Sequence, residues 1–295
     1  MTDVSTDANV QDWRKLYPFA PHYTTTAGGH RLHYVDEGKG PAVVMVHGNP
    51  TWSFYYRNVI QELSGSHRCI VPDHIGCGLS EKPQDWSYRL EDHIENLERL
   101  IDEVLELEQI DLVMHDWGGA IGMGYAVRHP EKVRRLVILN TGAFHGHPCP
   151  WRIRVCRIPG FGAVAVRGFN AFAGSAVHMA VTKPLAKAVR DGFLFPYNSW
   201  ANRIATLRFV EDIPLAVRHP SWQTLGTIQK NLHDLRSKPT MICWGEKDFC
   251  FTTDFLKTWR SYFPDAEVHS YPEAGHYILE DARDTVIPLI GKFLQ

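Results

Sequence analysis

Hydrophobic residues along this chain form short uninterrupted runs, which alternate with longer stretches where they recur every three or four positions. Such runs, bounded by polar residues or glycine, are typical of strands that are covered on both faces of a sheet. One segment, residues 31–38, instead alternates polar and hydrophobic positions, as a half-buried strand does. The predicted strands lie at residues 31–38, 41–46, 69–73, 112–115, 133–140, 239–245 and 266–271.

Amphipathic helices are predicted between these strands. Leu90, Ile94, Leu97, Ile101 and Val104 are spaced three or four positions apart, which places them on one face of a long helix. Because strands and helices alternate, we expect an α/β fold with a mostly parallel central sheet and helices on both faces. The other predicted helices span residues 52–63, 117–130, 252–262 and 280–293.

The alternation stops between residues 141 and 229, where short apolar segments are divided by prolines and carry many aromatic residues. This pattern predicts a helical cap that is inserted after one strand of the core. We therefore expect two parts, an α/β core formed by residues 1–140 and 230–295 and a helical cap formed by residues 141–229. Residues 1 to about 20 are expected to form a loosely attached lead-in to this core.

The net charge of −2, from 31 basic and 33 acidic residues, gives no reason to expect a nucleic-acid partner. Its distribution is uneven, because residues 142–230 contain 11 Lys and Arg but only 3 Asp and Glu. This basic cap is expected either to be an ordinary solvated surface or to mediate self-association or docking. The docking partner would be another enzyme or an anionic membrane surface.

Cysteine usage and hydropathy limit the cellular setting. No stretch has the roughly 18 uninterrupted apolar residues of a membrane-spanning helix, and the polar amino terminus predicts neither a secretion signal nor an anchor. The six cysteines form no CxxC pair, so we expect them to be reduced and the protein to be cytoplasmic. His145, His147 and Cys149 lack a fourth ligand at a recognisable spacing, and they predict a loop rather than a metal site.

Three chemically capable residues follow predicted strands of the core. Asp116 stands where a buried strand turns abruptly into a helix rich in glycine and alanine, Asp248 follows a late strand, and His276 follows the last one. The carboxyl ends of parallel strands meet at one edge of a sheet, so these side chains are expected to lie together. The chain order of nucleophile, acid and histidine is that of the α/β-hydrolase triad, with Asp116 in place of the usual serine.

An aspartate in the nucleophile position determines the chemistry. Its carboxylate is already charged at neutral pH and attacks directly a carbon that bears a good leaving group, such as a halide, an epoxide or a strained ring ester. His276, oriented by Asp248, would then activate a water molecule to hydrolyse the resulting ester of Asp116. The backbone N–H groups of Asn49 and Trp117 are suited to bind the oxyanion that forms in this step.

Several motifs resemble those of the haloalkane dehalogenases of the α/β-hydrolase superfamily. They are HGNPTWSFYYR (residues 47–57), PDHIGCGLSEKP (72–83) and VMHDWGG (113–119), with GEKD and GH near the carboxyl end. The resemblance extends over nearly the whole chain. It implies that the indole N–H of Trp117 and the side-chain amide of Asn49 bind the departing halide. It also implies hydrolysis of carbon–halogen bonds in small hydrophobic substrates through an Asp116 ester, with no cofactor and no metal.

A second activity is open on the same residues. The position of Asp248 after a late strand fits the third dehalogenase subfamily, and segments 169–174 and 195–215 resemble the caps of β-lactone decarboxylases of bacterial long-chain olefin synthesis. In such an enzyme Asp116 would attack the strained β-lactone, and loss of carbon dioxide would leave a cis-alkene. Both activities need the same nucleophile and an apolar cap, so the sequence separates them poorly.

Three other interpretations fit the residues less well. Epoxide hydrolases typically carry an aromatic residue where Asn49 stands, a glycine where Met114 stands and paired cap tyrosines, of which Tyr197 is the more obvious candidate here. Fluoroacetate dehalogenases usually have arginine where Trp117 stands. A catalytically inactive scaffold is expected to have lost a member of the triad, and none is lost here.

Overall fold

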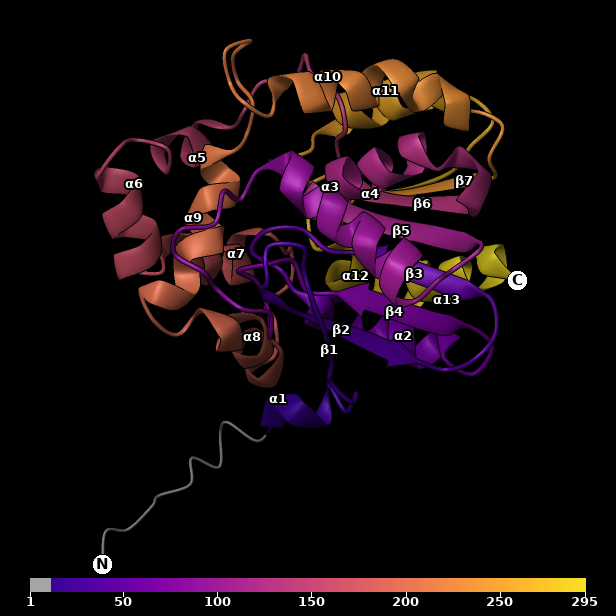
Figure 1. The fold of residues 1–295 in the computed structure, drawn as a ribbon, viewed down its shortest axis with the longest axis horizontal. Helices are drawn as coiled ribbons and strands as arrows, with labels where there is room; N and C mark the ends of the chain where they lie inside the picture. Colours follow the sequence, from indigo (N-terminus) through magenta and orange to yellow (C-terminus); the bar gives the residue numbers. More distant parts are fainter. Residues whose placement is uncertain (1–11) are drawn as a thin grey trace, which may run out of the picture.

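The central sheet organises the molecule. The computed structural model describes residues 12–295, and within them eight strands form one sheet in the order β1-β2-β4-β3-β5-β6-β7-β8 (Figure 1). β2 pairs antiparallel with β1 and with β4, and all other neighbouring pairs are parallel. The strands are β1 (His22–Thr25), β2 (Arg31–Glu37), β3 (Ala42–Val46), β4 (Arg68–Pro72), β5 (Ile110–Asp116), β6 (Val133–Thr141), β7 (Thr240–Gly245) and β8 (Glu267–Tyr271).

Alternate residues of each buried strand enter separate hydrophobic cores on the two faces of the sheet. In β3, Val44 and Val46 pack with α3, α4, α10 and α11, whereas Val43 and Met45 pack with α2, α12 and α13. This explains why β3 reads as an uninterrupted apolar run. The helices around the sheet are α2 (Arg57–Leu63), α3 (Leu90–Arg99), α4 (Trp117–Arg128), α10 (Trp222–Asn231), α11 (Thr253–Tyr262), α12 (Ile278–Asp281) and α13 (Arg283–Leu294).

The predicted α/β-hydrolase fold with its mostly parallel sheet is confirmed, and the structure differs from the expected elements in detail. The strand β1 (His22–Thr25) was not predicted. The long amphipathic helix ends as an α-helix at Arg99 and continues as a π-helical turn, η2 (Leu100–Val104). The last predicted helix is divided into α12 and α13, because the backbone leaves helical geometry at Ala282.

The expectation of a loosely attached lead-in is wrong for residues 12–20. Trp13, in the short helix α1 (Asp12–Lys15), and Tyr17, just after it, are 3% and 7% exposed. The Trp13 ring centroid lies 5.8 Å from that of Trp52 and 4.4 Å from that of Phe195. Aromatic packing against residues far along the chain therefore fixes this segment. Residues 1–11, on which the expectations of no signal and no anchor mainly rest, lie outside the described part of the chain.

The helices inserted after β6 gather at one end of the sheet (Figure 1). They are joined by short turns of 3-10 helix, η5 (Phe195–Tyr197) and η6 (Ala201–Arg203). α10 begins within the range expected for the cap but packs against α3 and α4, so we propose that the cap ends before Trp222. The cap helices are α5 (Trp151–Val155), α6 (Phe161–Ala163), the π-helical turn η4 (Val164–Gly168), α7 (Ala171–Met179), α8 (Lys187–Leu194) and α9 (Ile204–Glu211).

The structure also bears on two expectations from the sequence, namely that no helix spans a membrane and that the cysteines are reduced. Within residues 12–295, no helix combines the length and the apolar character needed to cross a membrane. All six cysteines are free thiols, and three of them, Cys149, Cys156 and Cys250, line the cavity described below.

Candidate active site

Asp116 occupies a sharp turn between β5 and α4. Its backbone angles, φ 53° and ψ −126°, are unusual for a residue other than glycine and turn the carboxylate out of the sheet edge. Immediately after this turn, the start of α4 lies very close to β3. A Cβ atom at Gly118 would lie 1.9 Å from the carbonyl oxygen of Val46, so only glycine permits this approach. The hydroxyl of Thr141 donates to the carbonyl of Asp116 and holds the turn.

The two carboxylate oxygens of Asp116 have different surroundings. Oδ1 accepts the backbone N–H of Asn49 at 2.6 Å, and the backbone N–H of Trp117 also binds the carboxylate. Oδ2 faces His276, whose Nε2 is 3.6 Å away. The backbone N–H of Asn49 therefore holds Oδ1, while Oδ2 is the oxygen that faces His276.

His276 is oriented by a buried acid. Its Nδ1–H donates to Oδ2 of Asp248 at 2.8 Å, so Nε2 is the nitrogen directed at Asp116. Asp248 also accepts the backbone N–H of Cys250 at 2.7 Å and the side-chain amide of Asn140 at 3.0 Å. Asn140, at the end of β6, also exchanges hydrogen bonds with the backbone of Gly245, and sequence reasoning missed it.

Burial and charge act against each other on the catalytic pair. Burial raises the pKa of Asp116, and the nearby His276 and the N–H groups of Asn49 and Trp117 partly oppose that rise. Burial alone would lower the pKa of His276. The carboxylates of Asp248 and Asp116 outweigh it, so the pKa of His276 lies above its ordinary value. The site therefore favours a protonated imidazole between two carboxylates.

The two residues expected to bind a halide lie beside the nucleophile. The side-chain amide of Asn49 donates one N–H to the carbonyl of Thr206 in α9 at 3.2 Å. An amide nitrogen carries a second N–H, which remains for a ligand. Trp117 lines the same cavity, and its ring centroid lies 5.3 Å from that of Phe209. Residues of the cap helix α9 thus help to position both side chains. The contact between Asn49 and Thr206 was not predictable from the sequence.

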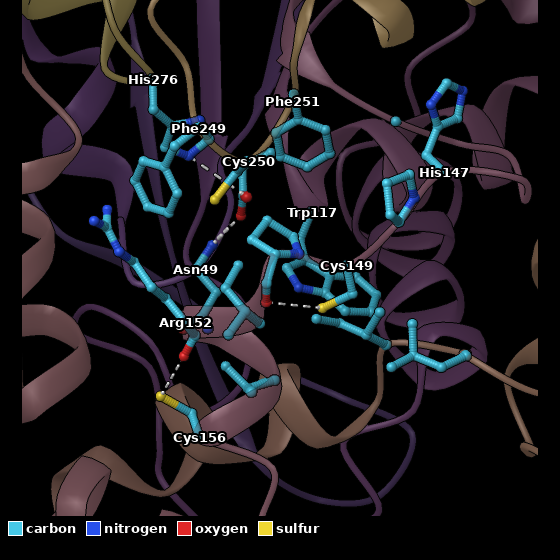
Figure 2. Close-up of a pocket in the computed structure, with 18 of the residues that line it drawn as sticks. Asn49, Trp117, His147, Cys149, Arg152, Cys156, Phe249, Cys250, Phe251 and His276 are labelled. Atoms are coloured by element: carbon cyan, nitrogen blue, oxygen red, sulfur yellow. Dashed lines mark hydrogen bonds and ion pairs between the residues drawn. The ribbon is translucent and has the colours of Figure 1, made fainter.

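A cavity of about 730 Å³ lies between the core and the cap, and Asn49, Asp116, Trp117 and His276 line it at one end. Figure 2 shows Asn49, Trp117 and His276 gathered on one side of this space, with Arg152 and Cys156 contributed by the cap. Most of the remaining wall is apolar, which suits a hydrophobic substrate with few polar atoms. Its larger hydrophobic side chains include Phe144, Trp151, Phe172, Met179, Leu215 and Trp222.

The histidine-rich turn after β6 makes packing contacts. The ring of His145 stacks on Trp222 with centroids 3.8 Å apart, and its Nε2 donates to the carbonyl of Trp222 at 3.1 Å. The ring of His147 stacks on Phe255 at 3.9 Å. Both residues therefore help to join the turn to α10 and α11.

The structure thus places a buried carboxylate, Asp116, on a strand-to-helix turn beneath a helical cap, with His276 and Asp248 beside it. A family model for the alpha/beta hydrolase fold matches residues 41–282. The chain belongs to this family, and within it to the group that contains haloalkane dehalogenases and similar β-lactone decarboxylases.

Several curated relatives match most of the chain. A protein of Shewanella oneidensis named cis-3-alkyl-4-alkyloxetan-2-one decarboxylase is 52% identical, over 95% of this chain and 89% of its own length. A protein of the same name from Xanthomonas campestris is 40% identical, over 95% and 97%. Haloalkane dehalogenase 2 of Mycobacterium bovis is 33% identical, over 94% and 95%.

Solved structures agree with this assignment. The haloalkane dehalogenase DbeA of Bradyrhizobium elkani superposes with a TM-score of 0.84 at 27% identity, covering 93% of this chain and 97% of that one. An ancestral haloalkane dehalogenase gives a TM-score of 0.82 at 26% identity, over 92% and 97%. The similarity includes the cap as well as the core, because the covered shares leave little of either chain unmatched.

Proposed function

We propose that this protein decarboxylates β-lactones that carry two cis alkyl chains, releasing a cis-alkene and carbon dioxide. The sequence alone placed haloalkane dehalogenation first and this reaction second. The observation that supports the reversal is that the relatives at 52% and 40% identity carry the decarboxylase name, whereas the dehalogenase relative is at 33%. The apolar cavity of about 730 Å³ supports a substrate with long hydrocarbon arms.

In the first step, Oδ2 of Asp116 attacks the saturated ring carbon that is bonded to the ring oxygen. The bond between that carbon and the ring oxygen breaks, and its electron pair remains on the released carboxylate. Oδ1 stays bound to the backbone N–H of Asn49 as it becomes the carbonyl oxygen of the new ester. Relief of ring strain favours this opening.

In the second step, the substrate carboxylate leaves as carbon dioxide. The electron pair of the broken carbon–carbon bond forms the double bond, and Asp116 departs with the electron pair of its ester bond. Attack opposite the ring oxygen inverts one carbon, and departure of the two groups from opposite faces then gives the cis-alkene. Lactone atoms are fully accounted for by alkene and carbon dioxide, so no water enters the reaction.

His276 has a different role in the two candidate reactions. In decarboxylation, its protonated Nε2, 3.6 Å from Oδ2, stabilises the charge that returns to Asp116 as the carboxylate departs. In dehalogenation, a neutral Nε2 must instead take a proton from the water that hydrolyses the ester. The carboxylates that raise the pKa of His276 are present for both reactions, so the pH dependence of each reaction, rather than the resting pKa, separates the two roles.

Haloalkane dehalogenation is the second candidate, and Trp117 and Asn49 favour it. Both side chains line the cavity beside Asp116, and neutral N–H donors suit a weakly hydrated anion that must later leave. Epoxide hydrolysis has less support, because the hydroxyl of Tyr197 donates to the carbonyl of Thr51 at 3.2 Å and the residue does not line the cavity. The six free cysteines support a reducing compartment, the cytoplasm, for either reaction.

A side-by-side turnover assay tests the proposal. Purified protein is given a cis-dialkyl β-lactone, 1-bromohexane and 1,2-dibromoethane, and alkene and bromide are measured. We expect fast alkene release from the lactone and at most trace bromide release. Bromide release at useful rates without alkene would reject the decarboxylase and establish the dehalogenase. An Asp116→Asn variant is the control, since both reactions require its carboxylate.

A further inference from the structure

The cap exposes an unusual number of large hydrophobic side chains. Among the described residues, every large exposed hydrophobic side chain except Tyr23 lies between positions 151 and 217. Five of them fall within residues 151–169, which we call the α5–η4 segment because it runs from α5 through α6 to η4. These five are Trp151, Ile158, Phe161, Val164 and Phe169, with exposed fractions of 70%, 50%, 56%, 51% and 80%.

The same segment is strongly basic. It contains Arg152, Arg154, Arg157 and Arg167 and no acidic residue. In the described part of the chain, no carboxylate lies within ion-pair distance of any of the four. By contrast, the cap's own acids are already occupied, since Asp191 pairs with Lys187 and Glu211 pairs with Arg208. The segment therefore carries a net positive charge. Arg152 and Arg154 are its exposed cations, whereas Arg157 and Arg167 donate hydrogen bonds to main-chain carbonyls of the cap.

The inner side of the α5–η4 segment forms part of the cavity wall. Trp151, Arg152, Ile153, Val155 and Cys156 all line the cavity that contains Asp116. Trp151 is also 70% exposed, so it lies at the boundary between the cavity and the outer surface. Figure 1 places α5 and α6 on the outer side of the cap, away from the sheet. The exposed apolar surface is thus continuous with the cavity wall through Trp151.

We propose that the α5–η4 segment docks on an anionic phospholipid bilayer, so that the cavity opens to the lipid and takes its substrate from it. Unpaired arginines beside exposed tryptophan, phenylalanine and aliphatic side chains match the charge of anionic headgroups and the apolar layer beneath them. The segment is also irregular, since residues 156–160 separate α5 from α6. A substrate with long alkyl chains concentrates in such a bilayer.

Vesicle co-sedimentation of the full-length protein tests this proposal. The vesicles are phosphatidylcholine alone or with about three-tenths phosphatidylglycerol, at about 0.05 M and about 0.5 M salt. We expect binding to the anionic vesicles at low salt and loss of most of it at high salt. A Phe161→Ser, Val164→Ser, Phe169→Ser triple variant is expected to bind at least about tenfold more weakly, since three apolar side chains no longer enter the lipid.

Matched variants separate docking from general effects. Tyr23→Ser removes the exposed aromatic side chain that lies outside the cap, and it should bind like the wild type. Arg154→Gln is expected to weaken binding. Arg260→Gln removes the same charge from an exposed position of α11, outside the cap, and is not expected to weaken it. Wild-type protein that stays in the supernatant with anionic vesicles overturns the proposal, and so does equal loss of binding in the variants and their controls.

Substrate delivery gives a second readout. Phe161, Val164 and Phe169 do not line the cavity, so the triple variant should turn over a short-chain substrate in solution at the wild-type rate. It should lose activity on a long-chain substrate that is supplied in anionic vesicles. Equal activity on the vesicle substrate would reject lipid delivery. The docking test uses no substrate, so its failure leaves the proposed reaction untouched, and failure of that reaction leaves docking untouched.

Discussion

Nε2 of His276 lies 3.6 Å from Oδ2 of Asp116, which is longer than a hydrogen bond. The other oxygen, Oδ1, is held by the backbone N–H of Asn49 at 2.6 Å. The histidine therefore attracts the nucleophile electrostatically without blocking the oxygen that attacks. In both proposed reactions it acts mainly after the ester has formed. It either stabilises Asp116 as the alkene departs or activates the water that hydrolyses the ester.

Replacing His276 with alanine should let Asp116 react once with an accepted haloalkane and then stall. The attack needs only the carboxylate, whereas hydrolysis of the ester needs the imidazole. Intact mass spectrometry after incubation with 1-bromohexane should show protein heavier by one hexyl group in place of one hydrogen. The Asp116→Asn, His276→Ala double variant is the control, and an unchanged mass in His276→Ala would show that Asp116 is not the nucleophile or that haloalkanes are not accepted.

The two candidate reactions should respond oppositely to pH. Decarboxylation needs Asp116 ionised and His276 protonated. Burial raises the pKa of Asp116, and the carboxylates of Asp248 and Asp116 raise that of His276. The rate of decarboxylation should rise as pH passes the raised pKa of Asp116 and fall as pH passes that of His276, above 6.5. Hydrolysis of a preformed alkyl ester should instead increase through the pKa of His276, because it needs the neutral base. Parallel pH profiles for alkene release and for alcohol release from the preformed ester would contradict these roles.

Asn140 should influence the rate through Asp248. An Asn140→Leu variant keeps a similar volume but removes the amide that donates to Oδ2 of Asp248 at 3.0 Å. It also removes the hydrogen bonds that Asn140 exchanges with Gly245, so we expect a loss of stability as well. We expect turnover to fall by about tenfold with a shifted pH profile, because Asp248 loses a buried hydrogen-bond donor. Asn140→Gln, which retains an amide, should recover part of the rate. A loss of stability without any change in the pH profile would indicate a purely structural role.

Arg57 and Glu280 should contribute strongly to stability. Their two hydrogen bonds, of 2.6 and 2.9 Å, join α2 to α12, and the side chains are 3% and 7% exposed. Arg57→Ala leaves the carboxylate of Glu280 buried without its partner, and we expect a loss of about 3–5 kcal/mol in the free energy of unfolding. Urea denaturation measures it. Arg208→Ala, which breaks an exposed pair, is the comparison and should change stability by less than about 1 kcal/mol.

Local pattern was sufficient to predict most of the fold. Runs such as Ala42–Val46 supply side chains alternately to the hydrophobic cores on the two faces of the sheet. A strand of this kind is therefore recognisable from its own residues, without knowledge of distant ones. The missed strand β1 lies at the sheet edge, where its residues alternate between exposed and partly exposed positions. Trp13 and Tyr17 were misjudged because their partners, such as Trp52 and Phe195, are remote in sequence.

The residues of the site were predictable to the extent that each follows a strand. Asp116, Asp248 and His276 were placed at one edge by that rule, and the distances between them show that they lie together. Asn140 could not be assigned, because its role rests on contact with a residue 108 positions later. The choice between the two reactions was also out of reach, since both use the same charged groups.

The hydrogen bond from the amide of Asn49 ends on a main-chain carbonyl, that of Thr206, rather than on a side chain. Any residue that keeps α9 helical presents the same acceptor, so substitutions at position 206 need not break this link. The cap is therefore free to diverge in evolution and acquire new chain-length preferences while the donor beside the nucleophile stays in register. The residues around Asp116 can therefore be conserved while the cap residues that shape the substrate pocket change.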